Sequence, residues 1–246
     1  MRINDNISSM ITQTSLYQAD SAMGKSLEKL STGLRVNRAS DDAAGLAVSE
    51  RLRAQVRGMD RAKMNAQDGI ALLQIAEGAA NEIEAILQRQ RELAVQAASD
   101  TLTSADRSYL SQEFEQLTKE IDRIADATQY NTKVLLSGDF DTDAKALVLQ
   151  VGANNTTGTD TMDVKIDSLK TSELTGGGNV LKDHVLSGAN RTKATEAIAI
   201  VDGALDQVNS LRANLGSYIN RLDHTINNLA NQAYNTQDAE ARIRDV

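Results

Sequence analysis

The C-terminal part of the chain carries a long series of apolar residues at alternating spacings of three and four. A period near 3.5 residues is typical of a helix that packs lengthwise against other helices. At ~1.5 Å per residue this helix would be roughly 54 Å long, which exceeds the core of a compact globule. We therefore predict a rod whose function lies in assembly rather than catalysis. The series runs from Ile198 to Ala233, is interrupted at Arg212, and includes Val201, Leu205, Leu215, Ile219, Leu222 and Ile226.

Two earlier stretches have the same period. Residues 43–99 follow Asp41 and Asp42, two acids that suit a helix N-terminus. Thr103 and Asp106 have the spacing of a capping box, which predicts a further helix over 104–127. Because so short a connection separates these two helices, we expect an antiparallel hairpin, with a last helix over 192–236 returning beside it. The residues expected to pack are Leu73, Ala80, Ile83, Leu87, Leu117 and Ile121.

The N-terminal stretch is a weaker helix. Its apolar stripe over 6–31 is interrupted by Ser and Gln, and Thr32-Gly33 is a natural helix stop, followed by a linker from Leu34 to Ser40. A helix with so little apolar surface is marginal alone. We expect it to become ordered against partners, namely other copies of the chain.

The middle of the chain changes to a period of two, which is typical of β-strands. Gly176-Gly177-Gly178 indicates a flexible loop before the last helix. The predicted fold is therefore mainly α, a long antiparallel coiled-coil helical rod or bundle, with a small β-hairpin element within about 140–190. The alternating apolar residues are Leu147, Leu149 and Val151 in one strand and Met162, Val164 and Ile166 in the other.

Composition narrows the function classes. The net charge of −8 and the pI near 4.9 argue against a basic nucleic-acid-binding surface. No apolar run of about 18 residues occurs, so we expect no membrane insertion. Cysteine is absent, which excludes disulfides and thiolate metal sites. The histidines His184 and His224 lack the spacing of a helical metal site, and no nucleophile has an evident base, so neither an enzyme nor a cofactor is expected.

Several long segments carry a family resemblance. The segment Ser26–Glu50 (SLEKLSTGLRVNRASDDAAGLAVSE) closely resembles bacterial flagellin, and the likeness spans nearly the whole chain apart from about 140–190. Further matching segments are NAQDGI (65–70), LQRQRELAVQ (87–96), EIDR (120–123), TQYN (128–131), LGSYINRL (215–222) and AEARIRDV (239–246).

The resemblance implies the subunit that polymerises into the bacterial flagellar filament for motility. Residues 1–42 would supply the N-terminal half of the inner tube plus a linker, and residues 43–246 would form the surrounding rod layer. The implied partners are other subunits, the filament cap, the hook-junction proteins and export chaperones. Export would use the flagellar type III apparatus, in agreement with an N-terminus that lacks a secretory signal, and would place the protein outside the cell.

The resemblance also implies recognition by the innate immune receptor Toll-like receptor 5. The matching residues are Arg89, Leu93 and Glu113. Arg89 and Leu93 are four residues apart, a spacing that puts them on one face of a helix. Without the resemblance, the charges at 89–92 would be interpreted as a solvated helix face.

One departure from the family concerns the C-terminal inner-tube helix, which follows the AEARIRDV motif in relatives and carries the export-chaperone site. The sequence stops at Val246, so we expect this helix to be absent and the form not to build native filaments alone. Two alternatives stay open: a hook–filament junction protein, and a coiled-coil binding or signalling module. Ala43 argues against the first, because junction relatives tend to have Pro after the paired acids.

Overall fold

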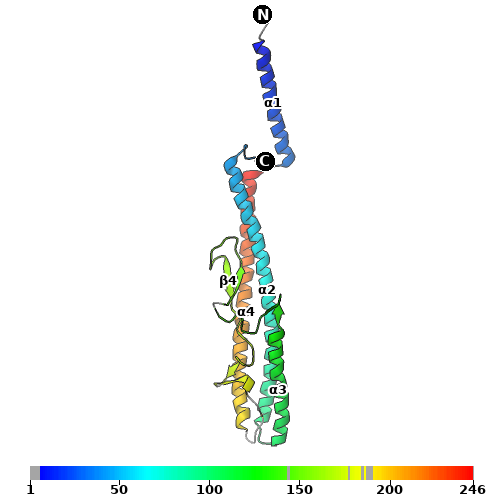
Figure 1. The fold of residues 1–246 in the computed structure, drawn as a ribbon, viewed down its shortest axis with the longest axis vertical. Coiled ribbons are helices and arrows are strands. Elements are labelled where there is room, and N and C mark those ends of the chain that lie inside the picture. Colours follow the sequence, from blue (N-terminus) through cyan, green and yellow to red (C-terminus); the bar gives the residue numbers. More distant parts are fainter. Residues whose placement is uncertain (1–5, 143–144, 177, 184–185, 187–190, 246) are drawn as a thin grey trace. The chain divides into compact units, whose positions relative to one another are not determined.

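A computed structural model describes residues 6–142, 145–176, 178–183, 186 and 191–245 (Figure 1). The chain divides into two compact units. Unit 1 comprises Met1–Asp60 and Leu229–Val246, and unit 2 comprises Arg61–Asn228. The helices are α1 (Ile7–Thr32), α2 (Ala43–Ala97), α3 (Ser104–Ala127) and α4 (Thr192–Arg244), with a 3-10 turn at Leu181–Asp183. The prediction of a mainly α fold with long, mutually packed helices is confirmed.

The first helix begins and ends where local chemistry dictates. The side chain of Asn6 accepts a hydrogen bond from the Ser9 N–H, so Asn6 is the N-cap of α1. Gly33 ends the helix in the left-handed conformation at φ +70°, with its N–H donated to the Lys29 carbonyl. Glycine adopts this conformation without the Cβ penalty of other residues.

The third helix starts with the expected capping box. The Thr103 hydroxyl accepts from the Asp106 N–H, and the Asp106 carboxylate accepts from the Thr103 N–H. This reciprocal pair satisfies two of the donors that a helix N-terminus leaves open.

The core of unit 2 lies between α2, α3 and α4, which run beside one another there (Figure 1). Among the twelve residues expected to pack, eight are buried and four are half-buried against the same core. The buried residues are Leu73, Ala80, Ile83, Leu87, Ile121, Val201, Leu215 and Leu222. The half-buried residues are Leu117, Leu205, Ile219 and Ile226.

The β-structure consists of three two-stranded antiparallel sheets in the described residues. The predicted hairpin is β3 (Leu147–Gln150) paired with β4 (Thr161–Val164), in a register that sets Leu147 opposite Val164. A second hairpin, β1 (Gln129–Tyr130) and β2 (Lys133–Val134), follows α3 directly. The third, β5 (Thr175–Gly176) and β6 (Asn179–Val180), lies where the sequence predicted a flexible loop. The described residues on either side, Gly176 and Asn179, are therefore paired, whereas Gly177 lies outside the described residues.

Helix α4 extends past the expected boundary at 236 and ends at Arg244. Ion pairs stabilise this added length. Arg242 pairs with Asp238 at 2.8 Å, and Glu240 is bound by Arg53 of α2 at 3.0 Å. The apolar series stops at Ala233, whereas polar contacts stabilise the last turns of the helix. Apolar periodicity therefore does not predict these turns.

Candidate assembly surfaces

Helix α1 exposes its apolar residues. None of its residues is buried, and the large apolar side chains are between 54% and 76% exposed. So many exposed large apolar side chains on one helix indicate an interaction surface. The exposed side chains are Ile7, Met10, Ile11, Leu16, Tyr17, Met23, Leu27 and Leu30.

The linker after α1 is bound to the end of α4 within unit 1. The N–H groups of Arg35 and Val36 both donate to the Arg244 carbonyl, at 2.6 and 3.4 Å. Leu34 and Asp245 form an antiparallel bridge, and the Val36 side chain is buried. These bonds satisfy a carbonyl that a helix C-terminus would otherwise leave open.

The paired acids after the linker have separate partners. Asp42 accepts from the Gly45 N–H at 2.8 Å, so it caps the start of α2 as expected. Asp41 instead accepts from the N–H groups of Arg38 and Asn37, at 3.1 and 3.3 Å. The Arg38 bond is the main cause of a pKa of Asp41 below its ordinary value.

Four charged side chains connect the start of α2 to the end of α4. Arg53 lies 3.1 Å from Glu50 and 3.0 Å from Glu240. Arg244 lies 3.0 Å from the same Glu50 and 3.9 Å from the same Glu240. Each charge therefore has two opposite neighbours. Because the charges form a network, the arrangement stabilises the contact more than an isolated surface pair would.

The receptor-matching residues lie where α2 meets α3. Arg89 donates to Glu113 at 2.8 and 3.0 Å and to Glu92 at 3.0 Å. These bonds, chiefly the one to Glu113, raise the pKa of Arg89 above its ordinary value. The structure places Leu93 differently, since its side chain is fully buried in the core. Leu93 therefore supports the helix beneath the ion pair and presents no surface of its own.

Ion pairs join α2 to α4 among the described residues of unit 2. Arg212, the residue that interrupts the apolar series, pairs with Glu84. Arg91 pairs with Asp202 at 2.6 Å, and this contact raises the pKa of Arg91. The interruption at Arg212 is thus a polar contact between neighbouring helices. Sequence reasoning did not find Glu84 or Asp202 as partners, although opposite charges on antiparallel helices are the signal that could have found them.

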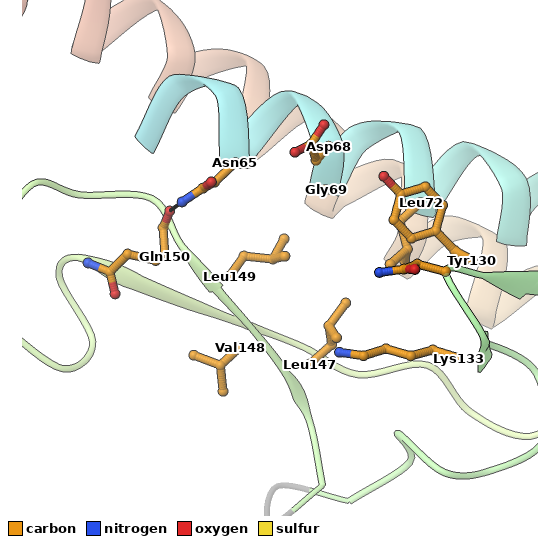
Figure 2. Close-up of a pocket in the computed structure, with 11 residues that line it drawn as sticks. Asn65, Asp68, Gly69, Leu72, Tyr130, Lys133, Leu147, Val148, Leu149 and Gln150 are labelled. Carbon is orange, nitrogen blue, oxygen red and sulfur yellow. Dashed lines mark hydrogen bonds between the residues drawn. The ribbon is translucent and has the colours of Figure 1, made fainter. Parts of the chain in front are cut away.

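A hollow of about 350 Å³ opens beside α2 in unit 2. Figure 2 shows α2 along one side, strand β3 along the other and the β1–β2 hairpin at one end. Gly69 allows the close approach, because a Cβ there would lie 2.6 Å from the Leu149 side chain. The lining residues are Asn65, Asp68, Gly69, Leu72, Tyr130, Asn131, Lys133, Leu147, Val148, Leu149 and Gln150.

The sequence pattern did not predict the β1–β2 turn at one end of this hollow. Strands of two residues are too short to show alternation. The turn residues Asn131 and Thr132 have φ values of +46° and +67°. Asn tolerates this conformation, so Asn131 was the residue from which a turn could have been predicted. A β-branched residue such as Thr132 adopts it only at an energetic cost.

Comparison with protein families matches both ends of the chain. Residues 3–141 match the bacterial flagellin N-terminal helical region, and residues 198–246 match the C-terminal helical region. The chain belongs to the bacterial flagellin family. It is 46% identical to a flagellin of Halalkalibacterium halodurans over 246 residues, covering all of this chain and 86% of that protein. It is 44% identical to a flagellin of Bacillus subtilis, covering all of this chain and 88% of that protein.

Solved structures agree with this assignment. The crystal structure of Bacillus cereus flagellin aligns with a TM-score of 0.54 at 34% identity, covering 72% of this chain and 94% of that one. A putative flagellar hook-associated protein of Vibrio parahaemolyticus aligns with a TM-score of 0.70 at 18% identity, covering 83% and 100%. The second likeness concerns the fold alone. The fold therefore does not separate filament from junction proteins, whereas the sequence matches do.

Family membership confirms the function that the resemblance implied. The chain is a structural subunit of the bacterial flagellar filament, polymerises with other copies, lies outside the cell in that filament and is not an enzyme. In the described part of the chain, every helix is too short or too polar to cross a bilayer.

Proposed function

We propose that two segments of the chain have separate roles in the filament subunit. Residues 1–42 supply the N-terminal half of the inner tube through α1, and residues 43–246 form the rod layer around it. The observation that carries this proposal is that α1 buries none of its residues while exposing eight large apolar side chains. Because an isolated helix is marginal in water, the exposed apolar side chains of α1 need neighbouring subunits to cover them.

Charge placed at exposed apolar positions of α1 tests this division. Leu16→Asp and Leu27→Asp should each suppress salt-induced association of the purified chain, measured by light scattering and pelleting. Ser15→Asp, which adds the same charge at an exposed polar position of α1 away from these apolar side chains, is the matched control and should associate like the wild type. If the wild type associates and all three variants match it, α1 is not an assembly surface.

We further propose that Toll-like receptor 5 contacts the Arg89–Glu113 ion pair, with Leu93 as an internal support. The support for this is the half-exposed position of both charges, at 49% and 45%, together with the resemblance to the family at all three positions. A half-exposed, geometrically fixed Arg pair is a typical interface anchor. Buried Leu93 acts by keeping the two helices in register.

Receptor binding by variants distinguishes residues that contact the receptor from a residue that only supports the helices. Arg89→Ala and Glu113→Ala should each weaken binding by about 1–3 kcal/mol without unfolding the chain. Leu93→Met should retain binding, since volume-conserving core changes are tolerated. Arg123→Ala, which breaks an exposed pair with Glu120 on the same helix, is the control. Unchanged affinity in both charge variants would remove the ion pair from the site.

Membership in the flagellin family supports a proposal for the remaining partners. We propose that the filament cap and the hook-junction proteins contact the subunit at the filament ends, and that export chaperones and the flagellar type III apparatus deliver it. Secretion of the chain should be lost in cells that lack the export apparatus while intracellular amounts persist. Continued secretion in such cells would contradict this route.

A further inference from the structure

Helix α1 carries its exposed apolar residues in two groups. Within each group the residues are three, four or seven positions apart, spacings that put them on one face of a helix. The first group, stripe 1, lies in the first half of the helix, and stripe 2 lies in the second half. Stripe 1 consists of Ile7, Met10, Ile11 and Tyr17, and stripe 2 consists of Leu16, Met23, Leu27 and Leu30.

The two stripes lie on opposite sides of the helix. Ile7 and Leu16 are nine residues apart, which is ~2.5 turns at 3.6 residues per turn. Met10 and Leu30 are twenty residues apart, or ~5.6 turns, so they too differ by about half a turn. One stripe followed along the whole helix therefore looks weak, although each half of α1 is amphipathic.

The side opposite each stripe is polar. Behind stripe 1 the helix presents uncharged polar side chains, and behind stripe 2 it presents charged ones. These residues are Ser8, Ser9, Thr12 and Gln13 behind stripe 1, and Lys25, Glu28 and Lys29 behind stripe 2. The polar and apolar sides thus change places halfway along α1. This pattern suits a helix that is covered on one side along its first half and on the other side along its second half.

The linker of the same chain lies on the polar side of the second half. Arg38 pairs with Glu28 at 3.0 Å, and the Asn37 amide donates to the Thr32 hydroxyl at 2.8 Å. Glu28 and Lys29 are half-buried, whereas all other residues of α1 are exposed. Stripe 2 points away from this linker. The described part of the chain therefore leaves both stripes open.

We propose that two different copies of the chain cover α1 in the filament, one on stripe 1 and the other on stripe 2. The proposal rests on the assembly role of α1 and specifies how many neighbours that role requires. Other copies are the occupants because the chain polymerises with itself. A neighbouring helix packs along one side of its partner, so one neighbour cannot cover stripes that are half a turn apart.

Opposite stripes also exclude a closed pair of α1 helices. In a two-fold pair each helix presents the same side to its partner, so one stripe of each helix would stay in water. Neighbours on opposite sides instead repeat the contact from copy to copy, which gives an open polymer. Burial of the remaining apolar stripe therefore favours growth over dimerisation.

Thiol protection tests the two sides, since the chain has no native cysteine. Traces of Met10→Cys or Met23→Cys, assembled with excess wild type, should react with a maleimide several-fold more slowly in the pellet than in the free subunit. Thr12→Cys and Lys25→Cys place the thiol opposite stripe 1 and stripe 2, respectively, and are the matched controls. Both controls should react in the pellet at close to their free-subunit rates.

A single covered side along the whole helix would protect a different pair of positions. The thiols at Met10 and Lys25 would then be slow together, or those at Thr12 and Met23, and either result overturns the proposal. Equal protection at all four positions overturns it as well. A single-sided pattern leaves the assembly role of α1 in place, whereas a wild type that forms no polymer removes that role together with the proposal.

Photo-cross-linking counts the neighbours. A copy that carries a benzophenone on Met10→Cys or on Met23→Cys, diluted into excess wild type, should give a product of two chains when the pellet is irradiated. A copy labelled at both positions should give a product of three chains, because each label reaches a different neighbour. If the doubly labelled copy gives products of two chains only, one neighbour covers both stripes and the proposal is wrong.

Discussion

At the scale of single residues, two glycines decide how β5 meets α4. A Cβ built on Gly203 of α4 would lie 2.6 Å from the Gly176 Cα and 2.8 Å from the Thr175 carbonyl oxygen. Gln207, one turn further along α4, exchanges hydrogen bonds with the main chain of Thr175. The hairpin is therefore packed backbone against backbone on the helix, at a distance that only glycine permits.

Alanine at two glycines of α4 should have opposite effects. Gly203→Ala should lower the free energy of unfolding by about 1–3 kcal/mol, because the added methyl group meets main-chain atoms. Gly216→Ala should raise it by roughly 0.5–1 kcal/mol, since a Cβ there has nothing within 4 Å and alanine favours helix. Urea unfolding followed by circular dichroism measures both. A stabilised Gly203→Ala variant would show that the close approach is not present in solution.

The polar interruption of the α4 stripe gives a second prediction. Arg212→Leu should destabilise unit 2 by about 1–3 kcal/mol, because it leaves Glu84, only 18% exposed, without its cation. The double variant Glu84→Leu with Arg212→Leu should recover most of the loss, since apolar pairs often replace shielded ion pairs at little cost. A double-mutant cycle in urea measures the coupling. Additive losses would exclude a direct contact.

At the scale of elements, α3 depends on its capping box. The hydroxyl and the N–H of Thr103 both donate to the Asp106 carboxylate, at 2.7 and 3.0 Å, and these bonds lower the pKa of Asp106. A lowered pKa in the folded state means that the folded chain binds fewer protons than the unfolded chain. The resulting stabilisation is complete above the unfolded pKa of about 3.9 and is lost as pH falls through the lower folded value.

Removing the Thr103 hydroxyl should therefore change both stability and its pH dependence. Thr103→Ala should cost about 1 kcal/mol near neutral pH. Its free energy of unfolding should also fall less steeply than that of the wild type between about pH 4 and pH 2, because Asp106 loses its main donor. Thr101→Ala, which removes a hydroxyl without a carboxylate partner, is the control. Parallel pH curves for wild type and Thr103→Ala would contradict the assignment.

At the scale of the whole molecule, the two units differ in how much core they contain. The main core cluster lies in unit 2 and draws on α2, α3, α4 and the β-hairpins. Helix α1 in unit 1 contributes nothing to a core. Local stability should follow this difference, because opening a segment costs the contacts it buries.

Hydrogen exchange rates should reflect this difference in local stability. Amides of α1 in the free subunit should exchange fastest among the helices, and amides around Leu73, Ile83 and Leu215 should exchange slowest. After assembly, protection should rise most in α1, because other copies then cover its exposed apolar side chains. Mass spectrometry of free and pelleted protein measures this. Strong protection of α1 in the free subunit would contradict a marginal helix.

The sequence by itself determined the elements with long periods and local signals. The 3.5-residue repeat located the helices of unit 2, and the boundaries at Asn6, Gly33, Thr103 and Asp106 follow from side-chain chemistry within one helical turn. Family motifs, which are also local, determined the function. These features can be predicted from the sequence because each depends on residues that are close along the chain.

Only the tertiary structure decided which of these residues are accessible and which charges meet. It buried Leu93, paired Arg212 with Glu84 and formed the hollow from α2, β2 and β3. It also extended α4 to Arg244 through partners on α2. Each outcome depends on residues far apart in sequence, whose contact is set by packing and register. Periodicity along one helix carries no information on that register.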